Sequence, residues 1–497
     1  MSLLKQLASE TAIYGLSSIL SRLVNWIILT PYLTRIFRQG EYGVVNDLYT
    51  WIALLLVLFT YRMETAFFRY GRQPQEMDRA FATAALSLLS STLVFSIILL
   101  CFSQPIAALL HYTEHPEYVR WFVGIVAMDA IAAIPFARLR LENRPLHFAL
   151  IKALGIGINI IFLFFLLEIC PRLSEAYAGS PFIDWYRTND KILYVFVANF
   201  IASFATVLLL WPQYRRLRVR AVASLFDAQL LRQMILYALP LVLSALAAVV
   251  NSLIGIPMLR FLADDATAGI YSAAAKLAVL MNLFTQAFNY AAEPFFFRHA
   301  DRSDARAIYA QVAQAFALVG SLVFLGIMLY IDVIQYLLGK DFREGLGILP
   351  ILLFANLLLG LYYSVSIWFK LSDKTTIGGY IAMGGAIITL LVNYLFITHP
   401  AVGYYAPAWA ALVCYGAMLS ACYVLGQRYF PVQYPVWRIA LYMLLALAFY
   451  ALDATLLPGL LQHPVWLYVG KTLLLLLYVA WLFHMERGES GLLRKKI

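Results

Sequence analysis

The chain is a succession of long apolar stretches separated by short polar segments. A helix that spans a bilayer needs roughly 20 mostly apolar residues to cross a hydrocarbon core of about 30 Å. Fourteen stretches meet this requirement, near 11–34, 45–66, 80–104, 118–137, 147–168, 191–211, 231–258, 269–292, 307–331, 346–369, 376–398, 405–426, 437–457 and 464–485. The pattern therefore predicts an all-α integral membrane protein of about 14 transmembrane helices.

Composition agrees with this class. Apolar residues make up 63% of the chain and charged residues 13%, whereas soluble proteins have roughly 45–50% apolar and about 25% charged residues. The first apolar stretch starts after Glu10 and lacks a small-residue cleavage site, so we expect it to be retained as a span. The segments between the stretches are too short for a soluble domain.

The sequence contains none of the motifs that would indicate an enzyme. It has no P-loop, no GxSxG and no HExxH, and these motifs carry phosphate binding, acyl transfer and zinc hydrolysis respectively. The cysteines form no CxxC and no Cys/His cluster, so neither a disulfide framework nor a zinc site is expected. They are Cys101, Cys170, Cys414 and Cys422. We therefore predict no catalytic residues, no metal and no cofactor.

The basic residues are unevenly distributed along the chain. The net charge of +10 raises the question of nucleic-acid binding, but the arginines and lysines gather in alternate connections between the predicted helices. The concentrated groups are Arg69/Arg72/Arg79, Arg138/Arg140/Arg144, Arg215/Arg216/Arg218/Arg220, Arg298/Arg302/Arg306 and Arg494/Lys495/Lys496. This is the positive-inside pattern, which places both termini in the cytoplasm and requires an even helix count. Contact with anionic membrane lipid explains the charge without nucleic acid.

Two segments of the chain resemble each other. Residues 61–69 read YRMETAFFR and residues 290–298 read YAAEPFFFR, with five of the nine positions identical. A glutamate and an arginine at the same spacing are informative because charged residues are rare here. The similarity continues upstream, where EYGV at 41–44 and AGIY at 268–271 open the corresponding helices. We interpret the chain as an internal duplication.

The duplication predicts the domain organisation. The two copies are six helices apart, and an even number gives both halves the same orientation in the membrane. We expect two parallel six-helix bundles around a central cavity, with two extra C-terminal helices. The boundaries are 1–213 for the first half, 214–230 for a cytoplasmic linker, 231–427 for the second half and 428–497 for helices 13–14 and the tail. Such an arrangement is typical of transport by alternating access.

Charged and polar side chains inside predicted spans are the candidate functional residues, because each charge costs roughly 2.5–3.5 kcal/mol to insert. Arg22 lies in the middle of the first span, with Asn25 on the same helical face. Lys276 lies in the eighth span. There Asn282, Gln286 and Asn289 continue along one stripe. Either these residues line a substrate cavity, or Arg22 and the stripe pair with other helices and Lys276 extends to the interface.

Charges at the ends of the second and eighth spans suggest a gate. Glu64 and Glu293 occupy equivalent positions of the duplicated motif, and Arg62 precedes the first of them. They either pair between the halves as a cytoplasmic gate or anchor the helix ends at the interface. Asp129 is a lone acid in the fourth span, where it either binds a proton or sodium ion for coupling or has a structural partner.

The chain resembles the polysaccharide flippases of the multidrug/oligosaccharidyl-lipid/polysaccharide exporter superfamily. The resemblance covers the whole chain and is strongest at TR (34–35) followed by GEYG (40–43), and at GIYSAAAKL (269–277). It implies a bacterial inner-membrane protein that moves an undecaprenyl-diphosphate-linked oligosaccharide to the outer leaflet for O-antigen, capsule or exopolysaccharide synthesis. Arg22 and Lys276 suit the cationic cavity of such proteins. Glycan-assembly enzymes are the partners it implies.

Two other functions remain open at this point. A drug/cation antiporter of the same superfamily would need a carboxylate-rich cavity, whereas the acids here are mostly peripheral and Asp129 is the exception. A membrane glycan polymerase or ligase would need a large outward loop, and residues 169–190 form only a modest one. A structural scaffold would not explain Arg22 and Lys276 within the membrane.

Overall fold

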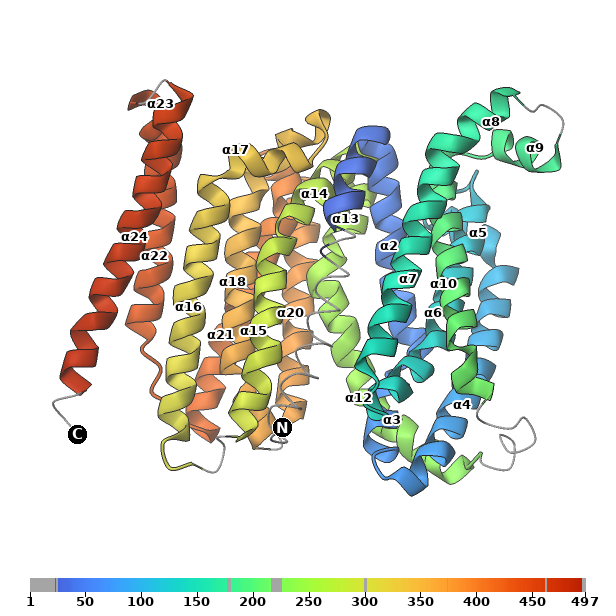
Figure 1. The fold of residues 1–497 in the computed structure, drawn as a ribbon, viewed down its shortest axis with the longest axis horizontal. Helices are drawn as coiled ribbons and strands as arrows, with labels where there is room; N and C mark the ends of the chain where they lie inside the picture. The colour runs from blue at the N-terminus through green and yellow to red at the C-terminus, as the bar shows by residue number, and fades with distance from the viewer. Residues whose placement is uncertain are drawn as a thin grey trace. The chain divides into compact units, whose positions relative to one another are not determined.

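The protein is described by a computed structural model, which covers residues 23, 26–176, 180–215, 226–298, 302–372, 374–460 and 463–493. These residues form helices and no strands. The chain divides into two compact units, Met1–Gly269 and Ile270–Ile497, which we call unit 1 and unit 2. Figure 1 shows the helices coloured along the chain.

Unit 1 contains the helices drawn from blue to green in Figure 1. They are α2 (Gln39–Thr60), α3 (Met63–Tyr70), α4 (Pro74–Cys101), α5 (Ser103–Leu109), α6 (Pro116–Leu141), α7 (Pro145–Phe164), the π-helix η1 (Phe165–Ile169), α8 (Cys170–Ala176), α9 (Pro181–Thr188), α10 (Lys191–Arg215), α12 (Ala228–Leu253) and α13 (Gly255–Leu262). Helix α14 (Asp265–Leu277) begins in unit 1 and ends in unit 2.

Unit 2 contains the remaining helices and several short 3₁₀ turns. They are α15 (Val279–Arg298), α16 (Ala305–Leu329), α17 (Ile331–Ile334), η2 (Gln335–Leu337), η3 (Lys340–Ile348), α18 (Leu349–Val365), α19 (Ile367–Leu371), α20 (Thr375–Phe396), η4 (Gly403–Tyr405), α21 (Ala406–Tyr429), α22 (Val436–Thr455), α23 (Leu457–Leu460) and α24 (Pro464–Leu493). Helices α16, α18 and α21 form its packed centre, and α20 packs against α21.

The prediction of a multi-pass helical membrane protein is confirmed. Within the described residues, 12 helices are long and apolar enough to cross a membrane, and the bent pair α14–α15 brings the number to 13. These correspond to all the predicted stretches except the first. Of that stretch, 11–34, the structure describes residue 23 and those from 26 onward, which are helical.

Several predicted helices are interrupted, and one predicted loop is partly helical. The second span breaks between α2 and α3, where Tyr61 and Arg62 have φ of 30° and 55°. The eighth span bends by 43° between Leu277 and Val279. The predicted loop at 169–190 instead carries α8 and α9. Apolar periodicity cannot reveal such breaks, because the residues on both sides are equally apolar.

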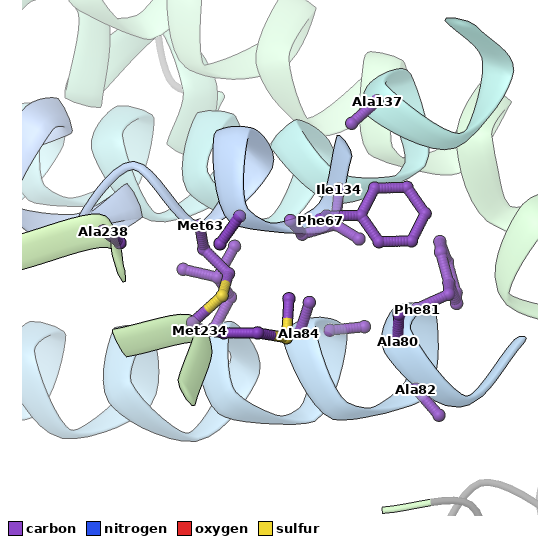
Figure 2. Close-up of a cluster of buried hydrophobic side chains, with 13 residues drawn as sticks. Met63, Phe67, Ala80, Phe81, Ala82, Ala84, Ile134, Ala137, Met234 and Ala238 are labelled. Atoms are coloured by element: carbon purple, nitrogen blue, oxygen red, sulfur yellow. The ribbon is translucent and has the colours of Figure 1, made fainter. Parts of the chain in front are cut away.

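The apolar cluster at the end of α3 fixes the position of that short helix. Figure 2 shows Met63 and Phe67 of α3 between Phe81 of α4, Ile134 of α6 and Met234 of α12. Each of these five side chains is fully buried. Alanines of α4 at 80, 82, 84 and 85 are also buried, and small side chains let membrane helices approach closely.

The end of unit 1 that holds this cluster also carries a group of arginines, and we call it the basic end. They include Arg69, Arg72, Arg79, Arg138, Arg140 and Arg144. Arg138 is buried and joins α6 to α4, since its Nη2 lies 2.8 Å from Asp78 Oδ1 and its Nε 2.8 Å from Glu142 Oε1. The arginines at this end are therefore structural ties as well as orientation signals.

Helix α12 is held to unit 1 at the basic end. The carboxylate of Asp227 caps α12 by accepting hydrogen bonds from the Gln229 and Leu230 N–H groups, at 2.8 and 3.1 Å. It also pairs with Arg79 of α4, and the Asp227 N–H donates to Thr83 Oγ1 at 3.2 Å. Helices α12 and α13 therefore pack in unit 1, although the duplication assigns residues 231–427 to the second half. The predicted linker, 214–230, is described only outside 216–225.

The two C-terminal spans are fastened to α16 by polar contacts. Near one end, the Tyr442 hydroxyl donates to Glu486 Oε1 at 2.6 Å, and Gln314 Nε2 donates to the same atom at 2.8 Å. At the other end, buried Lys471 pairs with Asp332 and lies 3.8 Å from buried Asp453. Helices α22 and α24 are therefore an integral part of unit 2.

The Asp227 cap makes the stability of unit 1 depend on pH. The pKa of the Asp227 carboxyl is lowered, chiefly because the Leu230 N–H donates to it, with the Gln229 N–H and Arg79 adding to the effect. Its stabilisation is present above about pH 4, the ordinary Asp pKa, and is lost as pH falls through the lower pKa of the folded protein. We expect Asp227→Asn to reduce the loss of melting temperature between about pH 7 and pH 3. Thermal unfolding in detergent measures this. Glu114→Gln, at an exposed carboxylate far from Arg79 in the sequence, is the control, and an unchanged pH dependence in Asp227→Asn would contradict the prediction.

Lys471→Met should destabilise unit 2, because it leaves the Asp453 carboxylate buried without its nearby cation. Breaking a buried ion pair costs about 3–5 kcal/mol. Adding Asp453→Asn should recover most of the loss, since neither buried charge then remains. Chemical denaturation of the purified protein measures both changes, with Lys340→Met at an exposed position as control. Equal stabilities of Lys471→Met and wild type would show that the pair is not needed.

Candidate functional site

A polar cavity lies within unit 1 at the depth of the membrane spans. It has a volume of about 570 Å³ and is lined by residues of α2, α3, α6, α7 and α10. Its polar lining residues are Thr60, Arg62, Glu64, Asp129, Arg140, Lys152, Asn159, Asn199, Ser203 and Thr206. The remaining lining residues are apolar and include Leu56, Phe68, Phe136 and Phe148. Polar groups at this depth are expected to face the protein interior or water, which is what this cavity provides.

The break between α2 and α3 directs two of the predicted residues to the cavity. Tyr61 and Arg62 both adopt the left-handed conformation, which costs non-glycine residues of order 1–3 kcal/mol each. The packing of Met63 and Phe67 on the far side of α3 stabilises this turn. Arg62 Nη1 lies 3.3 Å from Glu64 Oε1, and both side chains are about one-third exposed. Arg62 and Glu64 therefore pair with each other at the cavity.

Asp129 shares the cavity with a lysine that the sequence analysis did not single out. The Asp129 carboxylate accepts a hydrogen bond from the Ser203 hydroxyl of α10 and interacts electrostatically with Lys152 of α7. Lys152 Nζ also lies 4.3 Å from the centre of the Phe136 ring. Asp129 of α6 thus interacts with a hydroxyl donor from α10 and with a cation from α7.

The amides and the second arginine complete the lining. Asn199 Nδ2 donates to the Tyr49 hydroxyl at 2.9 Å, which orients the amide from α10. Arg140 lies near the basic end of α6, with Cζ 4.8 Å from the centre of the Phe148 ring. Asn159 of α7 lines the same space.

The charges in the cavity favour an anion. Three cations, Arg62, Arg140 and Lys152, face two acids, Glu64 and Asp129. Guanidinium and ammonium groups bind phosphate through charge-assisted hydrogen bonds. The hydroxyl and amide groups around them supply donors and acceptors for a neutral polar ligand, and the volume is within the roughly 300–1,000 Å³ typical of ligand pockets.

Four more predicted residues lie on the helices at the bend of the eighth span. Lys276 is one residue from the end of α14, and Asn282, Gln286 and Asn289 follow along α15; all four are partly buried in unit 2. The Ala278 carbonyl at the bend accepts a hydrogen bond from Asn356 Nδ2 at 3.4 Å. The same carbonyl also accepts hydrogen bonds from the Met281 and Asn282 N–H groups, at 3.2 and 3.4 Å. The buried amide therefore joins α18 to the bend.

The structure does not describe every predicted residue. Arg22 and Asn25 lie outside the described residues, and the side chain of Glu293 in α15 is likewise not described. Their predicted roles in the cavity and the gate stay predictions. Among the residues that are described, no group of three or more His, Cys, Asp or Glu side chains comes together as a metal site.

Three cavity residues were missed in the sequence, although their signal was present. Lys152, Asn159 and Asn199 all lie inside predicted spans, at 147–168 and 191–211. The rule that selected Asp129, that a polar residue in a span needs a reason, applies equally to them. The rule cannot tell which spans face one another, and only that placement shows that these side chains meet.

Comparisons with known proteins agree with this fold. A family profile described as "Polysaccharide biosynthesis protein" matches residues 7–300. The structure is similar to the lipid II flippase MurJ in an inward closed conformation, with a TM-score of 0.70, 12% identity and coverage of 95% of this chain and 98% of that one. It is also similar to an inward-facing multidrug resistance transporter of the MATE family, with a TM-score of 0.63, 14% identity and coverage of 87% and 95%.

The sequence itself is far from those structures, and no curated protein matches it in a sequence search. At such low identity the structural similarity concerns the fold. The family profile, by contrast, covers more than half of the chain. The protein is therefore a member of the polysaccharide biosynthesis protein family, with the fold of the flippases and transporters of the MOP superfamily.

Proposed function

We propose that the protein is a flippase that moves an undecaprenyl-diphosphate-linked oligosaccharide from the cytoplasmic to the outer leaflet, for surface polysaccharide synthesis. The observation that carries the proposal is the unit 1 cavity, in which Arg62, Arg140 and Lys152 lie among hydroxyl and amide groups. Membership of the family supports the substrate class. The similar fold of a lipid II flippase supports the mode of action.

The composition of the cavity suits the two parts of such a head group. A diphosphate is matched by the cations, through charge-assisted hydrogen bonds. Sugar hydroxyls lose their hydration in hydrocarbon, which is unfavourable unless other groups replace the lost hydrogen bonds. Asn159, Asn199 and Thr206 line the cavity and offer such groups. The polyprenyl tail needs no cavity because it is as apolar as the lipid around it.

The basic end of unit 1 is proposed to face the cytoplasm of a bacterial inner membrane, as the positive-inside rule requires. The substrate would enter from that side, where glycan-assembly enzymes produce it. Two parallel halves, 1–213 and 231–427, would then alternate in exposing the site to either side. No nucleotide-binding motif is present in the sequence, so an ion gradient or the substrate flux would drive the cycle.

The remaining predicted residues take proposed roles in this cycle. Arg22, Asn25, Lys276, Asn282, Gln286 and Asn289 are proposed to contact the substrate; Glu64, Glu293 and Arg62 are proposed to form a cytoplasmic gate. Asp129 is proposed to bind the coupling proton or sodium ion. Its hydrogen bond with Ser203 and its electrostatic interaction with Lys152 support this role, because protonation of the carboxylate would weaken its attraction for the lysine.

A drug/cation antiporter is the second candidate function. The observation that favours it is the presence of two acids, Glu64 and Asp129, in the cavity. An organic cation would bind to these carboxylates and be repelled by the three cations. The balance of charge therefore favours the flippase, and the substrate classes are separated by the export experiment below. A glycan polymerase or ligase would instead leave unpolymerised units displayed outside when deleted.

The cavity should be accessible to water. We expect Ala133→Cys, at a lining position of α6, to react with a small hydrophilic maleimide. Ala130→Cys, on the same helix at a fully buried position, should react at least about ten-fold more slowly, because thiol reactivity requires access. Both variants carry Cys101→Ser to remove an exposed native thiol. Equal rates in the purified protein would mean that the cavity is closed to solvent.

Deletion of the gene should stop surface polysaccharide display and leave lipid-linked repeat units on the cytoplasmic side. Plasmid-borne Arg140→Gln or Lys152→Gln should restore display at least about ten-fold less well than wild type, because each loses a charge-assisted hydrogen bond of about 1.5–3 kcal/mol. Arg144→Gln, at a basic-end arginine that does not line the cavity, is the matched control. Lipid extraction and immunoblotting of the glycan measure the result.

Two outcomes would contradict the proposal. Full display with both cavity variants, at normal protein levels, would exclude the cavity as the substrate site. If deletion left the glycan unchanged while the wild-type protein exported cationic dyes, the antiporter function would replace the flippase.

A further inference from the structure

A buried arginine joins three segments of unit 1 at the end opposite the basic end. Arg260 is the last-turn cation of α13, the short helix that Figure 1 shows beside α2. Its side chain is only 6% exposed. We call the following group the Arg260 cluster: Arg260, Asp47, Asp265, Tyr112, and the carbonyls of Leu110 and His111.

The guanidinium of Arg260 makes hydrogen bonds to two backbone carbonyls and ion pairs with two carboxylates. Nη1 donates to the Leu110 carbonyl at 2.7 Å, and Nη2 donates to the His111 carbonyl at 3.2 Å. Nε lies 2.7 Å from Asp265 Oδ1 at the start of α14, and Nη1 lies 3.6 Å from Asp47 Oδ2 in α2. One side chain thus joins α2, the turn after α5, and α14.

The cluster compensates a charge that has no access to water. Asp47 is fully buried, and its Oδ2 accepts a hydrogen bond from the Tyr112 hydroxyl at 2.7 Å. Cζ of Arg260 lies 3.8 Å from the centre of the Tyr112 ring, so the cation also stacks on the residue that binds the carboxylate. Removal of the arginine would leave Asp47 buried without a cation, which is strongly unfavourable.

Next to this cluster, two glycines allow the backbones of α2 and α14 to touch. A Cβ added to Gly43 would lie 2.0 Å from the Asp265 carbonyl oxygen, and one added to Gly269 would lie 1.9 Å from the Gln39 carbonyl oxygen. Each glycine thus meets the carbonyl four residues before the other one. Gly43 and Gly269 occupy equivalent places in the duplicated sequence, and a reciprocal contact of this kind is what a twofold axis between repeats produces.

This contact connects the first repeat with a helix that continues into unit 2. Helix α14 runs without interruption from Asp265 to Leu277 and bends only after that residue, beside Lys276. A movement of α14 that opens this end of the protein would have to separate Gly43 from Gly269. It would also have to pull Asp265 away from Arg260.

We propose that the Arg260 cluster is the gate that closes the outer end of the transport path, and that it opens once in each cycle. The proposal rests on the proposed function only for the need to open this end. Arg260 stays with α13, Asp47 with α2, and Asp265 with α14, so the gate opens by breaking the ion pairs of Arg260 and the contact between Gly43 and Gly269.

A reversible cross-link across the gate tests the proposal. A Cβ added to Gly40 would lie 3.6 Å from the Asp265 Cβ, within the roughly 3.5–4.5 Å that disulfides span. We expect Gly40→Cys/Asp265→Cys to form a disulfide on mild oxidation. Glycan export by the oxidised protein should then fall at least about ten-fold below that of its reduced form. The single variants, which cannot form the bond, should show no dependence on redox state.

The outcomes of this test are distinct. If the oxidised variant exports as well as its reduced form, the contact between α2 and α14 does not open and the gate proposal is wrong. If deletion of the gene leaves the glycan unchanged, the proposed function is wrong, and the gate is then judged by the measurement on purified protein below.

Hydrogen exchange provides a readout that needs no substrate and no export. In Arg260→Met/Asp47→Asn no carboxylate is left buried without its cation, so the variant is designed to fold. Amides in 39–47 and 265–269 should exchange at least about ten-fold faster than in wild type, because this end opens more often. Amides of α18 in unit 2 serve as the internal control. Unchanged exchange in 39–47 and 265–269 would overturn the proposal.

Discussion

The structure depends on one constraint, the high cost of an uncompensated polar group where no water can reach it. In unit 1 the constraint explains why Asp47 lies under Arg260 and Tyr112. In unit 2 it explains why Lys471 lies beside two carboxylates. Burial of each of these charges alone would cost much free energy, and the cost falls when opposite charges and hydrogen-bond partners are buried beside it. Charged residues within the spans therefore occur in sets that different helices contribute, and each set holds those helices in register.

In the polar cavity, polar groups avoid this cost because they have access to an open volume that water or a ligand can fill. Around Asp129 and Lys152 the lining groups face an open volume as well as one another. A ligand with phosphates and hydroxyls supplies the partners that such groups need, as water does in its absence. A closed cluster such as that of Lys471 stabilises the fold, whereas an open one is available for binding. This difference in access is why the cavity, rather than the closed Arg260 cluster, is proposed as the substrate site in unit 1.

The two copies of the duplicated motif show how tertiary packing modifies a shared sequence. In the first copy the chain breaks at Tyr61–Arg62 and α3 turns onto a core of α4, α6 and α12. In the second copy, residues 290–298 continue α15 without a break. The bend in the second repeat comes earlier, after Leu277, where Asn356 of α18 donates to the Ala278 carbonyl. The repeats share their helix order, and local contacts decide where each helix is interrupted.

Hydropathy and spacing alone determined the membrane class and the order of the spans, and the sequence alone shows that residues 61–69 and 290–298 resemble each other. These properties follow from the length of apolar stretches and from residue identity, which are local. They also selected Arg62, Glu64 and Asp129, because a charge in a span is unusual whatever surrounds it. The tertiary structure alone decided that these three share a cavity with Lys152, that Arg260 reaches Asp47, and that Gly43 meets Gly269. Such contacts join residues up to 226 positions apart in the chain, and they depend on which helix faces are opposed, which periodicity within one helix does not encode.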